Sequence, residues 1–263
     1  MPASADTCSI LTVDRGLQVL RAFHSAPIPL TNARLVQRTG LSKATVSRLT
    51  TTLLNIGYLR RGADGREFEL ASRALMVGFA FASTSELLET INPLLQALAD
   101  EIGGAACLTV PDDKEMLCVA SRASVRIKTI RFGRGCVVPM AATAAGRAYL
   151  WDLPAAERDT ALATLRLTAS PDKWAFVESE IHESFQQLER GGTCIVRGGF
   201  SPGLYAVATP VKLGLGRFCG VVSCGKTSSR EPDLELEHKR LAGPLRSAAA
   251  QIQSLLSGLH GRP

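Results

Sequence analysis

One segment in the first quarter of the chain carries side chains suited to contact with a polyanion. If it is helical, Val46, Leu49 and Leu53 fall within about 60° of one another and face a core. The far side then offers small hydroxyls, an amide and one arginine, from Ala44, Ser47, Arg48, Thr51 and Asn55. A helix that enters the DNA major groove needs such an uncrowded, donor-bearing side. Lys43 and Thr45 flank it in the first turn, where a helix N-terminus favours a phosphate.

The neighbouring sequence predicts the elements that hold this helix in place. A preceding short helix is capped by Thr31 or Asn32 and ends at Gly40, since glycine takes the left-handed conformation without strain. Ser42 then caps the helix itself, which ends at Gly57.

Two further elements complete a winged helix-turn-helix. An earlier helix spans about residues 13–23, and strands at 58–61 and 66–70 surround an Asp-Gly pair that is typical of a hairpin turn. The order helix, helix, tight turn, helix and hairpin predicts this DNA-binding fold.

Basic residues concentrate in the same part of the chain. The first 70 residues hold nine Lys and Arg against five Asp and Glu, whereas the rest of the chain is close to balanced. The hairpin arginines are expected over the DNA backbone or the adjacent minor groove. The alternative is a solvated polar face with no partner. The residues predicted to contact DNA are Thr31, Ser42, Lys43, Ala44, Thr45, Ser47, Arg48, Thr51, Arg60, Arg61 and Arg66.

The composition indicates a globular protein that works inside the cell. Of 263 residues, 46% are hydrophobic and 21% charged, enough to bury a core. The seven cysteines form no C-x-x-C pair and the four histidines are dispersed, so we expect reduced thiols, no metal site and no cofactor. No signal peptide and no apolar run of about 20 residues is present, which predicts a cytoplasmic protein without a membrane partner.

The rest of the chain mixes helices and strands, which predicts an α+β domain. A helix from about residue 72 is expected to connect it to the first domain. We expect further helices at 86–101, 155–165, 174–190 and 234–256, a small-residue helix starting near 144, and strands at 106–110, 116–120, 127–131, 205–211 and 218–224.

An enzyme reading rests on one string. Residues 199–203 match G-x-S-x-G, the serine hydrolase elbow, with Ser201 as nucleophile. The elbow uses the backbone N–H of the next residue, and here that residue is Pro202, which has none. Gly214-Leu-Gly216 lacks the third glycine of a dinucleotide loop and predicts a turn. A non-enzyme is therefore expected, with a small-molecule hydrolase as the alternative and a module that does not bind DNA as a third.

Several stretches, in order, resemble the IclR (isocitrate lyase regulator) family of bacterial transcription factors. They are Thr12-Val-Asp-Arg-Gly-Leu-Gln-Val-Leu, Thr39-Gly-Leu-Ser-Lys-Ala-Thr-Val-Ser-Arg-Leu, Gly57-Tyr-Leu, Pro139-Met-Ala-Ala-Thr-Ala-Ala-Gly-Arg-Ala and Ala206-Val-Ala-Thr-Pro-Val. The resemblance implies a leader at 1–11, a winged helix-turn-helix at 12–71, a linker helix at 72–85 and an effector-binding domain at 86–258. That last domain would have a curved antiparallel sheet of the GAF or profilin type with flanking helices.

The resemblance also implies a function. It predicts a ligand-responsive repressor or activator, for example of a catabolic operon, that binds near-palindromic operators as a dimer or tetramer. The chain lacks the acid that family members carry at the positions of Val196 or Gly199, so we expect an apolar pocket. Thr143, Arg197, Ser223 and the helix start at Ala144 are candidate anchors for a small or aromatic organic acid. The alternative is that these small residues only permit close packing. The implied lining is Ile127, Ile130, Ala144, Ala145, Val196, Leu204, Ala206, Val222 and Cys224.

Overall fold

The computed structural model describes residues 10–24, 28–127, 132–213 and 218–259. The chain forms two compact units, Met1–Thr84 and Ser85–Pro263, and each is described by itself. Within the described residues, no single helix is long and apolar enough to cross a bilayer.

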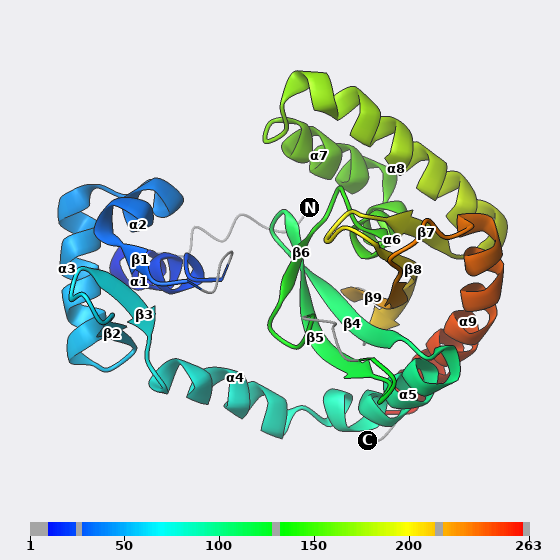
Figure 1. Ribbon diagram of the computed structural model, residues 1–263, viewed down its shortest axis with the longest axis horizontal. Helices are drawn as coiled ribbons and strands as arrows, with labels where there is room; N and C mark the ends of the chain where they lie inside the picture. Colours follow the sequence, from blue (N-terminus) through cyan, green and yellow to red (C-terminus); the bar gives the residue numbers. More distant parts are fainter. Residues whose placement is uncertain (1–9, 25–27, 128–131, 214–217, 260–263) are drawn as a thin grey trace. The chain divides into compact units, whose positions relative to one another are not determined.

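The first unit is a small helical domain with a three-stranded sheet (Figure 1). The sheet order is β1-β3-β2, antiparallel throughout. Its core joins Val19, Leu35, Val46, Leu53 and Phe68, one or two from each main element. The elements are α1 (Leu11–Arg21), β1 (Leu30–Thr31), α2 (Asn32–Thr39), α3 (Lys43–Asn55), β2 (Leu59–Arg61), β3 (Glu67–Leu70) and α4 (Arg73–Thr84).

Local signals set the helix boundaries as the sequence predicts. The Thr31 hydroxyl accepts the Arg34 N–H at the start of α2, and Gly40 ends α2 at φ +67°. The Ser42 hydroxyl accepts the Thr45 N–H at 3.2 Å and caps α3. These caps satisfy N–H groups that a helix leaves open at its first turn.

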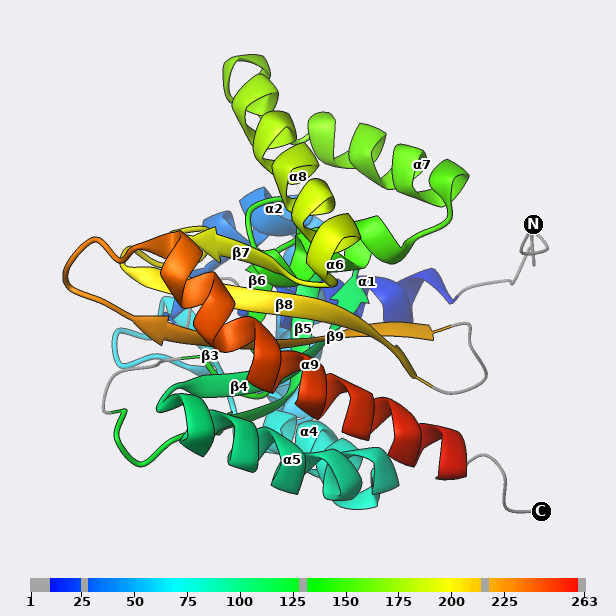
Figure 2. The ribbon, with the colours of Figure 1, turned by 90° about the vertical axis from the view of Figure 1, so that its right-hand side faces the viewer.

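The second unit is built on one six-stranded antiparallel sheet of order β6-β5-β4-β9-β8-β7 (Figure 2). Neighbours β4 and β9 are more than 100 residues apart in sequence, and Cys107 pairs with Ser223. The predicted α+β class and the antiparallel sheet are confirmed. The strands are β4 (Ala105–Asp112), β5 (Glu115–Ala123), β6 (Val137–Pro139), β7 (Cys194–Arg197), β8 (Leu204–Leu213) and β9 (Phe218–Thr227).

Helices cover the two faces of this sheet unequally. α5 (Glu86–Ile102) and α9 (Leu234–Leu259) pack against each other and on one face. α6 (Ala144–Asp152) lies on the other face, with α8 (Pro171–Gly191) packed against it and α7 (Ala155–Arg166) leading between them. The buried Arg147 ties α6 to α8, because its guanidinium donates to the Glu180 carboxylate and the Ser184 hydroxyl.

Some expectations need correction. Strands β6 and β7 were not predicted. Both are short, and each is recognisable as a strand only from its pairing with a longer strand. Of the predicted strand 127–131, Ile127 is not in a strand and 128–131 lie outside the described residues. The Gly214-Leu-Gly216 turn also lies outside them.

The start of α6 is fixed by very close packing. A Cβ added to Gly146 would lie 1.9 Å from the Met140 carbonyl oxygen, and one added to Gly199 would lie 1.7 Å from the Ala142 carbonyl oxygen. Real Cβ atoms do not approach backbone so closely. Only glycine therefore lets the segment before α6 lie against both α6 and the loop after β7.

We expect Gly146→Ala to lower the free energy of unfolding of the second unit by about 1–3 kcal/mol, because its methyl group overpacks this contact. Urea unfolding followed by tryptophan fluorescence reports this unit, since Trp151 and Trp174 both lie in it. The control is Gly191→Ala, at the end of α8 with no atom within 4 Å of the new Cβ. Equal stability of the two variants would contradict the close approach.

Candidate functional site

The outward side of α3 is exposed as predicted. Lys43, Ala44, Ser47, Arg48 and Thr51 are all exposed, while Val46 and Leu53 are buried. None of the exposed side chains belongs to an acidic residue. Among the described residues, no ion pair engages Lys43 or Arg48. This side of α3 can therefore meet a polyanion without first breaking an internal contact.

The hydroxyl groups near this side are not all equally available. The Thr51 hydroxyl donates to the Ser47 carbonyl at 2.9 Å, so it presents its methyl group and an acceptor outward. The Thr31 and Ser42 hydroxyls act as helix caps, and Thr45 lies within 2.9 Å of the Ser42 hydroxyl. Four predicted contacts thus have structural roles, and the donors that stay open are Lys43, Ser47 and Arg48.

The wing is defined as the hairpin of β2 and β3 with its turn (residues 59–70). It carries no net charge, although its arginines are predicted to contact DNA. It contains three arginines and also three acids, which are Asp64, Glu67 and Glu69. Arg60 forms an ion pair with Glu69 at 2.6 Å. Arg61 lies over the Phe68 ring, 5.4 Å from its centre, and donates to the Gly65 carbonyl. Arg66 is exposed, and no partner is found for its guanidinium among the described residues.

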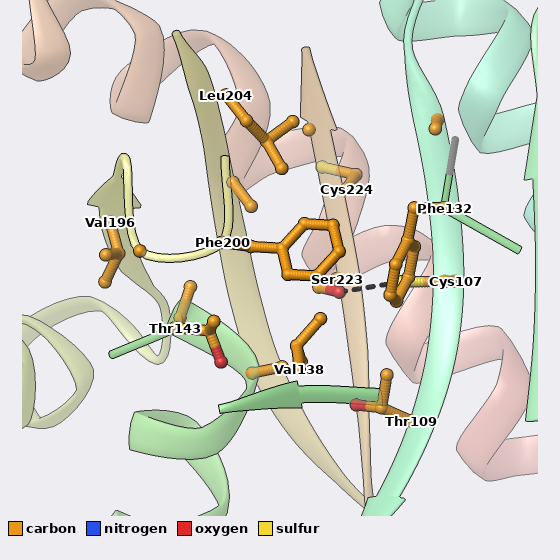
Figure 3. Close-up of a pocket in the computed structure, with 16 residues that line it drawn as sticks. Cys107, Thr109, Phe132, Val138, Thr143, Val196, Phe200, Leu204, Ser223 and Cys224 are labelled. Atoms are coloured by element: carbon orange, nitrogen blue, oxygen red, sulfur yellow. Dashed lines mark hydrogen bonds between the residues drawn. The ribbon is translucent and has the colours of Figure 1, made fainter. Parts of the chain in front are cut away.

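A pocket opens in the second unit between the sheet and the start of α6 (Figure 3). It holds about 80 Å³, several times the roughly 10–15 Å³ that one water molecule needs. Phe132 and Phe200 meet edge to face across it, with ring centres 5.6 Å apart. Among the residues that the structure describes, no charged one lines it. The lining is Ala105, Cys107, Thr109, Phe132, Val138, Thr143, Ala144, Ala145, Val196, Gly199, Phe200, Leu204, Ala206, Ser223, Cys224 and Gly225.

Most of the predicted lining residues meet in this pocket. They are Ala144, Ala145, Val196, Leu204, Ala206 and Cys224. Val222 is fully buried and does not border the pocket. Successive strand residues point to opposite faces, and its neighbour Ser223 takes the pocket side. Ile127 does not border the pocket either, and Ile130 lies outside the described residues.

Sequence reasoning missed the two aromatic rings. Phe132 directly follows the predicted strand 127–131, and Phe200 lies within the string that matches the hydrolase elbow. A signal did exist, because the chain has only nine phenylalanines and Phe200 stands among glycines in a loop. Cys107 and Thr109 were also missed, since their place opposite β9 depends on pairing across more than 100 residues.

Polar groups enter the pocket at two places. Thr143 caps α6, accepting the Gly146 N–H and donating to the Pro139 carbonyl at 2.8 Å. The N–H groups of Ala144 and Ala145, in the first turn, have no intrahelical partner and favour negative charge. Ser223 lies on the opposite wall. Arg197 is not an anchor, because it pairs with Glu231 and borders a separate polar groove.

Neither a hydrolase nor a metal site is supported by the described residues. Ser201 is exposed in a bend, and Pro202 supplies no N–H after it. No catalytic base is bonded to its hydroxyl within the part of the chain that the structure describes. In the same part, no three His, Cys, Asp or Glu side chains gather as metal ligands.

Two family models match the chain and together cover most of it. One is described as the IclR helix-turn-helix domain and matches residues 12–63. The other is described as the bacterial transcriptional regulator IclR C-terminal domain and matches residues 79–254.

Individual proteins give the same result. The Pca regulon regulatory protein of Pseudomonas putida is 26% identical over 249 residues, which is 94% of this chain and 84% of that protein. The crystal structure of an IclR family regulator from Brucella abortus has a TM-score of 0.84 at 29% identity, covering 96% of this chain and 95% of that one. An IclR homolog from Microbacterium hydrocarbonoxydans, complexed with 4-hydroxybenzoate, has a TM-score of 0.68 at 17% identity and covers 94% and 99%.

The ion pair in the wing yields a prediction about duplex DNA. Glu69→Gln frees Arg60 and removes one negative charge, so we expect tighter binding of random duplex and a slope of log K against log salt that is steeper by about 0.9. Fluorescence anisotropy over a salt series measures both. Glu235→Gln, which frees Lys239 on α9 in the other unit, is the matched control. An unchanged slope for Glu69→Gln would place the wing away from the DNA backbone.

Proposed function

The chain belongs to the IclR family of bacterial transcriptional regulators, and we propose that α3 reads its operator while the apolar pocket of the second unit binds a small organic effector. As in its relatives, this is the work of a DNA-binding regulator and not of an enzyme. The observation that carries the proposal is the outward side of α3, which is exposed, uncrowded and free of acids. The proposal places the protein with the DNA, in the cytoplasm.

Each open side chain on α3 has a distinct role in this proposal. Arg48, near the middle of the outward side, pairs with a guanine edge, for which a guanidinium is the commonest partner. The Thr51 methyl group packs against a thymine methyl, because its hydroxyl proton is already committed to the Ser47 carbonyl. Lys43, in the first turn of α3, binds a phosphate together with the helix N-terminus.

Self-association fits the apolar surface of α4. No residue of α4 is buried, and Leu75, Met76 and Phe79 are each about two-thirds exposed or more. A soluble chain rarely leaves so much apolar helix in water, so we propose that a second copy covers it. A dimer can present two copies of α3 to successive major grooves, about 34–36 Å apart, and so bind a near-palindromic operator.

The pocket favours a small ring with one polar or anionic end. Phe132 and Phe200 supply aromatic walls, and Ala144 and Ala206 leave room between them. The described lining residues offer an effector carboxylate no cation, so the first turn of α6 is its proposed binding site. The complex of the Microbacterium homolog with 4-hydroxybenzoate supports this class of ligand. A catabolic operon for such acids is the matching target.

The effector acts by shifting a population. A ligand moves an equilibrium between DNA-binding and non-binding arrangements only by its difference in affinity for the two. The start of α6 gives the pocket a rigid wall, because Gly146 and Gly199 lie against the Met140 and Ala142 carbonyl groups. In this proposal, a ligand that fits the wall in only one arrangement has the required difference in affinity. Whether the ligand releases or recruits the regulator decides between repressor and activator.

We expect Arg48→Ala to weaken binding to the operator, selected in vitro from random duplexes, by about 1–3 kcal/mol, and to weaken binding to random DNA much less. Anisotropy titrations at one salt concentration measure both affinities. Arg166→Ala, an exposed arginine on α7, is the control and leaves both unchanged. Equal losses on both DNAs would show that Arg48 contacts phosphate only; no loss on either would remove α3 from the interface.

A further inference from the structure

A thiol forms part of the wall of the pocket. Cys107 lies on β4 opposite Ser223 of β9, and its sulfur is 3.0 Å from the Ser223 hydroxyl oxygen (Figure 3). Its side chain is 9% exposed, and the pocket borders it. Both side chains lie on the sheet face that they share with Ala105, Thr109 and Ala206, as the alternation of the strands requires.

A second thiol lies next to Cys107. A bulge after Leu108 makes Thr109 pair with Cys118, so Cys118 shares the face of Cys107 and Thr109 and lies diagonally across from Cys107. Cys118 is 1% exposed and does not border the pocket. Among the described cysteines, Cys107 and Cys224 border the pocket, and burial raises the pKa of Cys224.

Among the described buried thiols, Cys107 is the one whose pKa is lowered by its surroundings. Hydrogen bonds from Cys118 and, to a lesser degree, Ser223 lower the pKa of Cys107, although burial opposes them. At Cys194, burial dominates and raises the pKa to about 12. The thiolate is the reactive form of cysteine, so Cys107 and Cys194 differ in reactivity as well as in access.

We propose that the pocket is a covalent attachment site in which Cys107 takes up small, uncharged α,β-unsaturated carbonyl compounds. The apolar lining admits an uncharged ring, because the described residues that border the cavity include no cation or acid. Phe132 and Phe200 hold the ring, and Ser223 keeps the sulfur directed along the pocket wall. This covalent site depends on the proposed function only because both use the same cavity.

The chemistry balances without an oxidant. The sulfur of Cys107 forms a bond to the β-carbon as the carbon–carbon π bond breaks. The electron pair of that π bond passes to the α-carbon and its carbonyl group. The thiol proton then reaches the α-carbon, and the Ser223 hydroxyl lies within hydrogen-bond distance of the sulfur to share that proton. The product is one saturated ketone joined to the protein through a thioether.

The test treats the full chain with 2-cyclohexen-1-one and maps adducts by peptide mass spectrometry. We expect Cys107 to react roughly tenfold or more faster than Cys194, which serves as a buried control within the same molecule. Cyclohexanone, which lacks the double bond, leaves no adduct. Ser223→Ala slows the reaction at Cys107, whereas Ser179→Ala, on α8 outside the pocket lining, leaves it unchanged.

An unmodified Cys107, or one that reacts no faster than Cys194, would overturn the proposal. Benzoate separates this failure from that of the effector site. If benzoate raises the melting temperature of the wild type and of Cys107→Ser alike while Cys107 stays unmodified, the cavity binds ligands and the covalent site is wrong. If benzoate shifts neither protein while Cys107 still reacts selectively, the covalent site stands and the organic-acid effector is wrong.

Discussion

The second unit depends on one steric constraint, the contact of backbone with backbone at the start of α6. Gly146 and Gly199 both lie against carbonyl groups of the segment that leads into this helix, and neither position has room for a methyl group. Thr143 then closes the turn by capping α6. This packing brings the first turn of α6 to the sheet and leaves the space that Phe132 and Phe200 narrow. The pocket is thus a consequence of where glycine is required.

In the first unit, the basic side chains differ in whether an internal partner already holds them. Lys43 and Arg48 are exposed and unpaired among the described residues, whereas Arg60 of the wing is held by Glu69. The wing is therefore close to neutral, so its net electrostatic attraction to the DNA backbone is weak. In the proposed complex, specific contacts concentrate on α3.

The sequence predicts the local parts of this molecule well and the long-range parts poorly. Thr31, Gly40 and Ser42 act through hydrogen bonds and dihedral angles within a few residues, so the boundaries of α2 and α3 follow from the sequence. The choice between Val222 and Ser223 as a pocket residue depends on strand register against β4, which no local pattern encodes. The ion pair of Arg60 was missed because its partner, Glu69, lies on the neighbouring strand. The register of β2 against β3 places the two residues opposite each other.

The central claim is that occupation of the pocket changes the affinity for DNA. The most direct measurement is the operator affinity of the wild type and of Ala206→Trp, with and without an organic acid that raises the melting temperature of the wild type. Coupling of about 5–150-fold is expected in the wild type. Ala206→Trp should bind the operator like the ligand-free wild type and ignore the acid, while Ala163→Trp on the exposed side of α7 should respond normally. A normal response from Ala206→Trp would contradict the account.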